Sequence, residues 1–327
     1  MIDELSALRR IKERFKNVSK NVLLGIGDDA AAVKIHPEKL LLVTTDSQVD
    51  SIHFTKGFIS AKDLGRRSVA VSVSDIGAMG GVPRFFLASI GFSRDEDEGF
   101  LEDLMDGFQK GAEEFEMELI GGNLSASGNL FIDITVLGEV EPNTMVKRGG
   151  AGVGDVIYVS GTVGDSALGL RVLQGGEKGK EDEYLIERHI SPRPRLALGR
   201  TLAEKGLPTS MIDISDGLIL DLERITVEHG LGAEVYIDRI PLSPCYRKRV
   251  SDFISDPYGL ALSGGEDYEL LFTSPSGREE EIREVSRALR IGIVGIGYVI
   301  PEPTIRVLGS TGEEVKIDKR GFIHFIG

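Results

Sequence analysis

Five aspartates occur where the sequence indicates strand ends and helix starts, and their side chains could together hold several divalent cations. They are Asp29, Asp46, Asp75, Asp213 and Asp216. Carboxylates gathered in one cleft repel one another and take up protons unless cations neutralise them. Ligands that are all oxygen suit Mg²⁺ better than zinc. The sequence therefore predicts a site for several Mg²⁺ ions, although each aspartate taken singly is equally compatible with a helix N-cap or a turn.

Apolar segments stand directly before three of these aspartates and indicate how the carboxylates are positioned. The run LLLVTT at residues 40–45 predicts a buried strand that ends at Asp46. Asp75 and Asp213 also follow apolar residues, where a carboxylate is costly unless it is paired or bound to a metal. The other elements predicted in this half are a strand at 130–138 and helices at 62–79 and 96–117.

Glycines indicate turns and a domain boundary. The segment ELIGGN at 118–123 predicts a short strand that runs into a glycine turn. The glycine-rich segment 141–153 predicts a boundary between two domains, 1–146 and 147–327. Strand and helix signals alternate on both sides of this boundary, so the predicted fold class is α/β, of the α+β type, with two domains.

The second half carries its own helix and turn signals. One helix is predicted from Asp165, a loop at 175–183, and a further helix at the prolines that follow residue 190. The stretch GLILDLERITVEHG predicts a helix that is capped at Gly230. Gly295 and Gly297 lie inside a strand pattern, which indicates a bend or a close contact rather than a nucleotide-binding loop.

Composition excludes several classes of partner. The chain has 327 residues and a net charge of −14, without a basic stripe, so we expect it to bind neither nucleic acid nor an anionic membrane surface. Cys245 is the only cysteine, which excludes disulfides within one chain and favours a reducing compartment. No run of about 18 apolar residues occurs. We therefore expect a cytoplasmic protein.

Common nucleotide-binding motifs are missing. Gly179 and Lys180 are followed by Glu181 rather than Ser or Thr, so there is no P-loop. Gly25, Gly27 and Ala30 fit a loose dinucleotide pattern, but the aspartates between them would face a pyrophosphate with negative charge. A kinase of the protein-kinase type and a GxSxG hydrolase are also excluded.

A series of motifs resembles the thiamine-monophosphate kinase family, which belongs to the superfamily of aminoimidazole ribonucleotide synthetase-like ATP enzymes. The similarity extends from about residue 20 to 300, and its main motifs are GIGDDAAAV, TTDSQVDSIHF, SVSDIGAMGG, IGGNLSASG, KRGGAGVGD, VSGTVGDSALGL, MIDISDGLILDL and LSGGEDYELLFT. The resemblance implies two domains of the superfamily architecture, each a mixed sheet covered by helices. It implies an N-terminal domain that binds ATP and metal and forms a homodimer, and a C-terminal domain that completes the active-site cleft.

The resemblance also implies a role for individual residues. The implied metal ligands, direct or through water, are Asp29, Thr44, Thr45, Asp46, Asp75, Asn123, Asp213 and Asp216. The implied ATP contacts are Gly122, Asn123, Arg148 and Ser215, and the implied contacts to thiamine monophosphate are His53, Glu266 and Phe322. Asp267 is adjacent to Glu266 and is an alternative contact. Some relatives have Asp at the position of Asn123, and Met105 stands where a tyrosine would meet adenine; its helical spacing with Leu101 and Phe108 favours a core role.

The implied reaction converts thiamine monophosphate and ATP to thiamine diphosphate, a step of thiamine diphosphate biosynthesis. The acceptor is a phosphate monoester with a second pKa near 6, so its oxygen is largely deprotonated at neutral pH. We therefore expect direct in-line transfer assisted by several Mg²⁺ ions, without a covalent nucleophile or a general base. Glu266 and Phe322 would suit the cationic thiazolium and the pyrimidine of the acceptor.

Two alternatives to this kinase stay open at the level of the sequence. One is another ATP enzyme of the superfamily, a purine-pathway amide ligase, which rests on the fold alone. The other is a protein without enzymatic activity that binds cations or a nucleotide as a regulator.

Overall fold

The computed structural model describes residues 4–26, 30–175, 179, 182–317 and 319–323. The chain divides into two compact units. The first unit comprises Met1–Ile76 and Gly81–Asn143, and the second comprises Gly77–Gly80 and Thr144–Gly327. None of the helices in the described part is long and apolar enough to cross a membrane.

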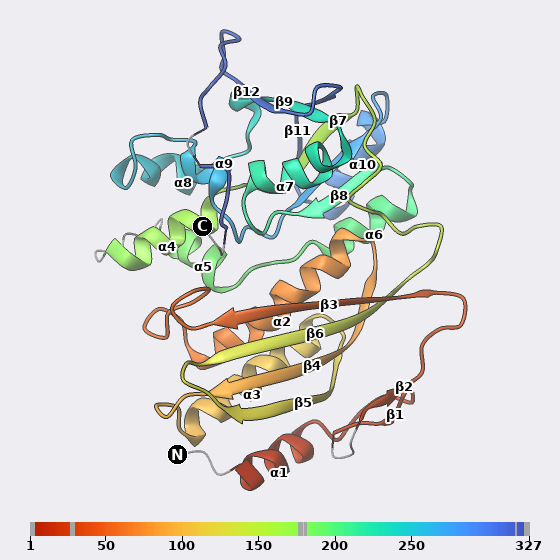
Figure 1. The fold of residues 1–327 in the computed structure, drawn as a ribbon, viewed down its shortest axis with the longest axis vertical. Coiled ribbons are helices and arrows are strands. Elements are labelled where there is room, and N and C mark those ends of the chain that lie inside the picture. Colours follow the sequence, from red (N-terminus) through yellow and green to blue (C-terminus); the bar gives the residue numbers. More distant parts are fainter. Residues whose placement is uncertain (1–3, 27–29, 176–178, 180–181, 318, 324–327) are drawn as a thin grey trace. The chain divides into compact units, whose positions relative to one another are not determined.

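A mixed sheet forms the centre of the first unit. Its strands, in order, are β3 (Leu40–Val49), β6 (Phe131–Val140), β4 (Val82–Phe92) and β5 (Glu118–Ala126). Neighbouring strands are antiparallel except β4 and β5, which are parallel. The helices α2 (Ala61–Ala78) and α3 (Glu98–Glu114) cover one face of this sheet (Figure 1). The predicted strands and helices of this half are thus present, with β3 four residues longer than its apolar run.

Helices α2 and α3 pack closely because glycines lie where they cross. A Cβ on Gly65 of α2 would lie 2.4 Å from the carbonyl oxygen of Leu104, and one on Gly107 of α3 would lie 2.1 Å from that of Lys62. Asp97 caps α3 by accepting a hydrogen bond from the backbone N–H of Phe100 at 2.9 Å. These contacts fix α2, and therefore Asp75 near its end, against the sheet.

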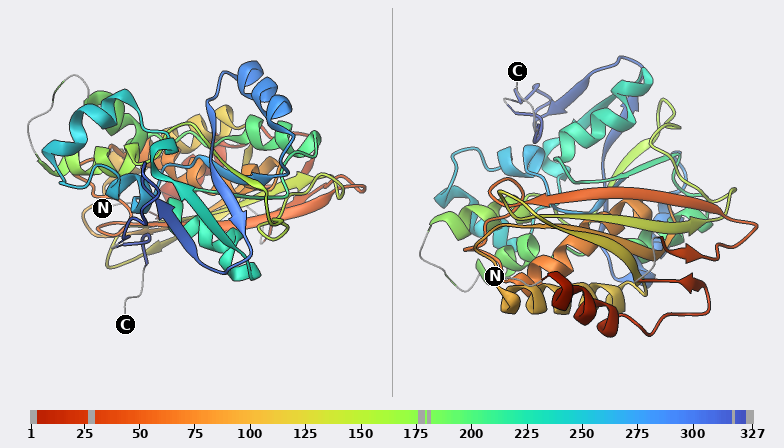
Figure 2. Two further views of the ribbon diagram at one scale, coloured as in Figure 1. Left: turned by 90° about the horizontal axis from the view of Figure 1, so that it is seen from above. Right: turned by 60° about the horizontal axis from the view of Figure 1, so that its bottom comes forward.

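The opposite face of this sheet is covered only in part by the described residues. The short strands β1 (Val22–Leu24) and β2 (Ala32–Val33) pair with each other, and Val22 packs with Phe85 and Ile120. The helix α1 (Glu4–Arg14) does not cover this face, because it lies beside α3, as Figure 2 shows. Leu41 and Val43 of β3 are exposed on the open part of the face.

The predicted glycine turn at 121–123 is wrong, because these residues continue strand β5. Gly122 pairs with Ala88 of β4, and a Cβ at Gly122 would lie 2.0 Å from the carbonyl oxygen of Ala88. The glycine is therefore required by the close approach of the neighbouring strand, not by a change in chain direction.

A second mixed sheet lies at the centre of the second unit. Its strands, in order, are β12 (Ile305–Leu308), β9 (Gly232–Tyr236), β11 (Ile293–Ile300), β7 (Val156–Ser160), β10 (Leu270–Ser274) and β8 (Ser210–Asp213). The pair β12–β9 is parallel and the other pairs are antiparallel. The register of β11 shifts between Gly295 and Gly297, so the bend predicted there is confirmed.

Helices cover both faces of this second sheet. On one face a core forms between the strands and α4 (Asp165–Gly175), α5 (Asp182–Ile190), α7 (Leu218–Ile225), α8 (Pro244–Arg249) and α9 (Gly259–Ser263). On the other face a second core includes α6 (Leu196–Glu204) and α10 (Glu279–Leu289). Short 3₁₀ turns occur at Val227–His229, Ile237–Arg239 and Val250–Asp252. The predicted helix that ends at Gly230 is divided at Thr226 into α7 and the first of these turns, and Gly230 caps that turn with φ 77°.

Helix α5 was missed by the sequence analysis, which placed a loop at 175–183 and the next helix at the prolines. The segment DEYLIERHI spans nine residues, too few for a clear helical period, and it buries the side chains of Asp182, Arg188 and His189 beside that of Leu185. Arg188 and His189 form hydrogen bonds with side chains of other elements of the second unit.

Candidate functional site

The first part of the site lies where β3 meets α2. Strand alternation places Thr44 and Asp46 on the same face of β3, toward α2. The hydroxyl of Thr44 donates a hydrogen bond to the Oδ2 atom of Asp75 on α2. The structure thus brings together a hydroxyl and a carboxylate from two of the predicted ligands.

Thr45 lies on the other face of the same strand. Its side chain is exposed, and its Oγ1 atom accepts a hydrogen bond at 3.2 Å from that of Thr135 on β6. The two adjacent threonines therefore cannot present their hydroxyls to one ligand, and the side chain of Thr45 does not join Thr44 and Asp75. Period-two alternation in a strand would have revealed this from the sequence.

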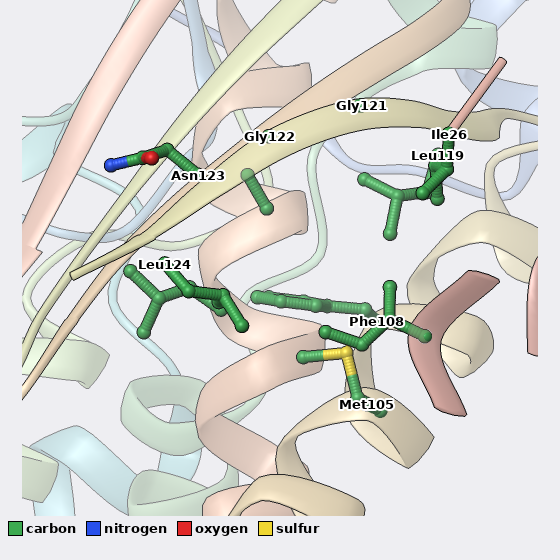
Figure 3. A pocket seen from close by; sticks show the side chains of 11 residues that line it. Ile26, Met105, Phe108, Leu119, Gly121, Gly122, Asn123 and Leu124 are labelled. Carbon is green, nitrogen blue, oxygen red and sulfur yellow. The ribbon is translucent and has the colours of Figure 1, made fainter. Parts of the chain in front are cut away.

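A pocket adjoins β5 beside Gly122 and Asn123 (Figure 3). Met105 of α3, only 3% exposed, belongs to the core, yet its side chain also forms a wall of this pocket with Phe108. The described lining is mostly apolar and consists of Ile11, Ile26, Ala88, Ile90, Met105, Phe108, Leu119, Gly121, Gly122, Asn123 and Leu124. A slot of this kind suits a flat apolar ring better than a phosphate.

His53 lies in the loop that follows β3. Its Nδ1 atom accepts a hydrogen bond from the backbone N–H of Val49 at 3.1 Å, so the proton of the neutral imidazole is on Nε2. Lys56 of the same loop donates to Oε1 of buried Glu96 at 2.7 Å, and this hydrogen bond raises the pKa of Lys56. The loop that carries His53 is therefore tied to the end of β3 and to the segment between β4 and α3.

In the second unit, Asp213 ends β8 and the residues after it form a tight loop. Oδ2 of Asp221 accepts hydrogen bonds from the backbone N–H groups of Ser215, Asp216 and Gly217 at 3.0, 3.0 and 3.1 Å. Asp221 is fully buried, and burial raises its pKa to about 6. This carboxylate shapes the loop of Asp213 and Asp216.

Arg224 holds one of the predicted metal ligands. Its Nη2 atom lies 2.6 Å from Oδ2 of Asp216, and its Nη1 atom lies 2.5 Å from Oδ1 of Asp221. The carboxylate of Asp216 is therefore neutralised by an arginine in this structure. Sequence patterns did not single out Asp221 or Arg224, although the two residues stand three positions apart on one predicted helix.

The backbone around this loop brings four predicted residues together. The N–H of Glu266 donates to the carbonyl of Ser215 at 2.8 Å, and the N–H of Phe322 donates to that of Asp216 at 2.9 Å. The backbone carbonyl of Lys147 accepts a hydrogen bond from the backbone N–H of Met211 in β8 at 3.0 Å. This contact places the exposed Arg148, the next residue, beside the same strand. Predicted contacts to ATP, metal and acceptor thus meet around residues 213–217.

Asp267 is not an alternative contact to the acceptor, because it is buried and both of its oxygens accept backbone hydrogen bonds. Oδ2 accepts from the N–H of Gly164 at 2.6 Å and Oδ1 from that of Ser166 at 3.2 Å, at the start of α4. Burial raises the pKa of Asp267 to about 7, and Arg188 and the two N–H donors oppose this shift. Asp267 therefore anchors the turn that carries Glu266.

We expect Asp267→Asn to lower the free energy of unfolding by about 1–3 kcal/mol, because an amide nitrogen cannot accept and one backbone N–H loses its partner. Urea unfolding of the variant and of Asp252→Asn, a change at an exposed carboxylate, would measure this. Equal midpoints for the two variants would contradict the anchoring role.

Asp29 lies outside the described residues. Within the part of the chain that the structure describes, no group of three or more His, Cys, Asp or Glu side chains is arranged to hold a metal ion. The predicted ligands are divided between the two units, with Thr44, Asp46, Asp75 and Asn123 in the first and Asp213 and Asp216 in the second.

Comparisons with known proteins agree with the motifs. Family models of the AIR synthase related protein match residues 27–140 for the N-terminal domain and 152–309 for the C-terminal domain. The thiamine-monophosphate kinase of Escherichia coli (strain K12) is 36% identical, over 98% of this chain and 98% of that protein.

Solved structures give the same result. The thiamine-monophosphate kinase of Stenotrophomonas maltophilia K279a has a TM-score of 0.83 at 31% identity, covering 96% of this chain and 98% of that chain. AaThiL complexed with AMPPCP and TMP has a TM-score of 0.78 at 32% identity, covering 98% of this chain and 97% of that chain. The expected fold, two mixed sheets covered by helices in the architecture of this superfamily, is confirmed.

Proposed function

The chain belongs to the thiamine-monophosphate kinase family, and we propose that it transfers the γ-phosphoryl group of ATP to the phosphate of thiamine monophosphate. The product is thiamine diphosphate. The observation that carries the proposal is the meeting of Ser215, Asp216, Glu266 and Phe322 around one loop, in a chain that matches such kinases along nearly its whole length.

The chemistry needs positioning and neutralisation of charge more than bond activation. The acceptor phosphate is largely deprotonated at neutral pH, so its oxygen attacks without a general base. Arg148 is exposed beside β8 and can bind phosphate oxygens through its planar guanidinium. Glu266 and Phe322 hold the cationic end of the acceptor, so that its phosphate is directed to the loop of Asp213 and Asp216.

The residues fit Mg²⁺ because their donors are oxygens, and the contact of Thr44 with Asp75 already joins two of them. We assign Mg²⁺ binding, direct or through water, to Asp29, Thr44, Thr45, Asp46, Asp75, Asn123, Asp213 and Asp216. Thr45 is the member that the geometry supports least, since its side chain faces away. When bound, Mg²⁺ supplies neutralisation of the charge on the phosphates.

ATP is the proposed donor, with its adenine in the pocket beside Gly122 and Asn123. The slot between β5 and α3 offers the side chains of Met105 and Phe108 to a flat ring, whereas the side chain of Asn123 projects from the other side of β5 (Figure 3). Met105 would then be a van der Waals contact to adenine rather than a stacking partner, because it has no ring.

An assay with a panel of acceptors tests the proposed function. Wild-type protein with Mg²⁺ and ATP is incubated with thiamine monophosphate, unphosphorylated thiamine or other phosphate monoesters, and ADP is measured. ADP formation that depends on thiamine monophosphate supports the proposal. An amide ligase of the superfamily or a regulator that only binds ATP would give no such dependence.

We also propose that two copies of the chain associate through the open face of the first sheet. Val43 of β3 is 61% exposed and Leu41 is 40% exposed, and both lie on the face that the described residues leave open. Because ATP is the donor and Cys245 is the only cysteine, we place the enzyme in the cytoplasm.

Val43→Lys is expected to convert a dimer to a monomer, since it would place two like charges in an apolar interface. Light scattering coupled to size-exclusion chromatography gives the mass. Val153→Lys is the matched control, because Val153 is 59% exposed in the second unit. A wild-type protein of monomeric mass, or a dimer that survives Val43→Lys, would contradict this interface.

A further inference from the structure

Glu266, the proposed contact to thiamine, is held in an unusual backbone conformation. Its φ is 67° and that of Tyr268 is 51°, a left-handed region that residues other than glycine seldom adopt. The N–H groups of Glu266 and Tyr268 donate to the carbonyls of Ser215 and Ile214 at 2.8 and 2.9 Å. The backbone of this turn is thus fixed to the loop of residues 213–217.

A histidine from the missed helix α5 faces that side chain. The Nδ1 atom of His189 lies 3.4 Å from Oε2 of Glu266 and 3.1 Å from Oγ of Ser166. The imidazole is buried, whereas the carboxylate of Glu266 is 25% exposed. A proton on Nδ1 can therefore be shared between a fixed hydroxyl and one oxygen of a carboxylate that reaches solvent.

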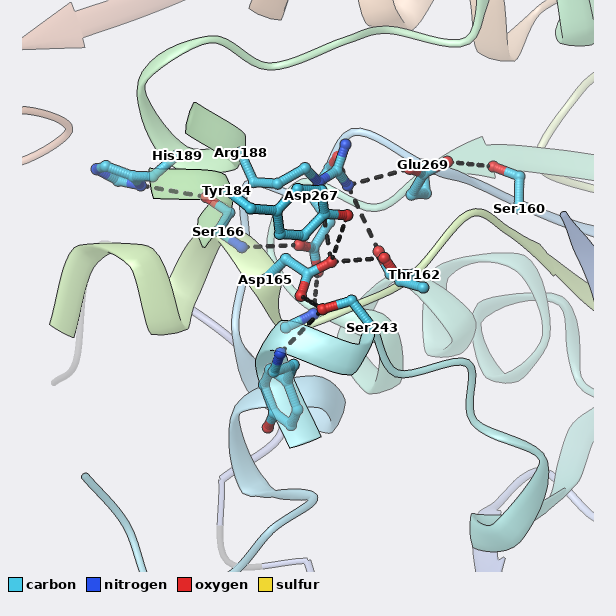
Figure 4. A network of polar contacts seen from close by, with 12 residues as sticks. Ser160, Thr162, Asp165, Ser166, Tyr184, Arg188, His189, Ser243, Asp267 and Glu269 are labelled. Atoms are coloured by element: carbon cyan, nitrogen blue, oxygen red, sulfur yellow. Dashed lines mark hydrogen bonds and ion pairs between the residues drawn. The ribbon is translucent and has the colours of Figure 1, made fainter. Parts of the chain in front are cut away.

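The elements that meet at His189 are tied together by its neighbours (Figure 4). Arg188 donates to Oε1 of Glu269 at 3.0 Å and to the backbone carbonyl of Asp267 at 3.2 Å. Asp267 in turn accepts the N–H of Ser166. Helix α5, the start of α4 and the turn of Glu266 therefore form one braced group, in which the imidazole has a set position.

We propose that His189 is a positioning residue that orients the carboxylate of Glu266 toward the thiamine part of the acceptor. The inference rests on the proposed function, which assigns Glu266 to the acceptor. The contact of Nδ1 with Oε2 at 3.4 Å restrains the orientation of the carboxylate, which has acceptor positions on both oxygens. The oriented carboxylate can bind a cation or an N–H donor. The thiazolium of thiamine is such a cation, and its aminopyrimidine has N–H donors. His189 thus acts on acceptor binding and not on ATP or on the transfer step.

The test is a set of kinetic measurements on His189→Ala, His189→Asn, Glu266→Gln and the double variant of His189→Ala with Glu266→Gln. Loss of the contact between the imidazole and the charged carboxylate predicts a KM for thiamine monophosphate about tenfold higher in His189→Ala. The kcat and the KM for ATP are expected to stay within about twofold of the wild type. Asn can place an amide N–H near the position of Nδ1, so His189→Asn is expected to recover most of the affinity.

Coupling between the two residues separates positioning from a general structural role. If His189 acts through Glu266, His189→Ala adds little to the KM of Glu266→Gln, since the two effects are not additive. Glu187→Gln is the matched control, because Glu187 lies on the same helix with an exposed side chain paired with Arg193. Urea unfolding of each variant checks that the fold is kept.

Four results would overturn the inference. Fully additive effects of His189→Ala and Glu266→Gln, or an equal loss of ATP affinity in His189→Ala, would assign His189 to the scaffold. A wild-type KM in His189→Ala together with a raised KM in Glu266→Gln would overturn the inference but leave the proposed function intact. An unchanged KM in Glu266→Gln would instead overturn the placement of the acceptor in the proposed function, and the inference with it.

Discussion

Asp75→Asn is expected to lower kcat by at least about a hundredfold at ordinary Mg²⁺ concentrations and to raise the Mg²⁺ concentration needed for half-maximal activity. The amide oxygen of Asn can still accept the hydrogen bond from Thr44, so the packing of α2 on β3 is preserved while the negative charge is lost. Asp46→Asn is expected to act in the same direction, because Asp46 and Thr44 share one face of β3.

Steady-state kinetics across a Mg²⁺ titration measure this effect, and urea unfolding shows that each variant folds. Asp103→Asn is the control, since Asp103 is an exposed carboxylate on α3. Near wild-type activity of both Asp75→Asn and Asp46→Asn at ordinary Mg²⁺ would remove these residues from the metal site.

Glu266→Gln is expected to raise the KM for thiamine monophosphate about tenfold to a hundredfold, which corresponds to the loss of roughly 1.5–3 kcal/mol for a hydrogen bond to a charged group. The kcat and the KM for ATP are expected to change little, because the contact is made equally in the ground state and in the transition state. The structure makes this assignment sharper than the sequence did, since Asp267 is buried and occupied by backbone N–H groups.

Kinetics with each substrate varied in turn provide the measurement, with Glu284→Gln on α10 as a control at an exposed glutamate. A selective loss of affinity for ATP or Mg²⁺ in Glu266→Gln would place the turn of residues 264–268 in the phosphate site instead.

Much of the fold follows from local sequence patterns. Strands β3 and β6 and helices α2 and α3 were predictable because long apolar runs and a clear helical period specify each of them. Helix α5 was not, because it is short and buries Arg188 and His189, whose pairing depends on other segments of the chain. Gly121 and Gly122 were interpreted as a turn from the sequence. The actual reason for Gly122 is the close carbonyl oxygen of Ala88 on the neighbouring strand, and the sequence does not show which strand that is.

The candidate site was predictable in its residues more than in its arrangement. The motifs identified Ser215, Asp216, Glu266 and Phe322, and the structure brings them together through backbone hydrogen bonds. The shape of the 213–217 loop depends on the carboxylate of Asp221, which reads as an ordinary helix residue in the sequence. The residue types therefore indicated the chemistry, whereas the supporting interactions depend on the tertiary fold.

The most direct test of the central claim is a single-turnover experiment with enzyme in excess over ATP labelled at the γ-phosphate. Direct transfer predicts that the label moves to thiamine diphosphate in step with ADP formation, that no label stays on the protein after denaturation, and that omission of thiamine monophosphate stops both. Labelled protein that forms before thiamine diphosphate, or ADP release at the same rate without thiamine monophosphate, would contradict the account.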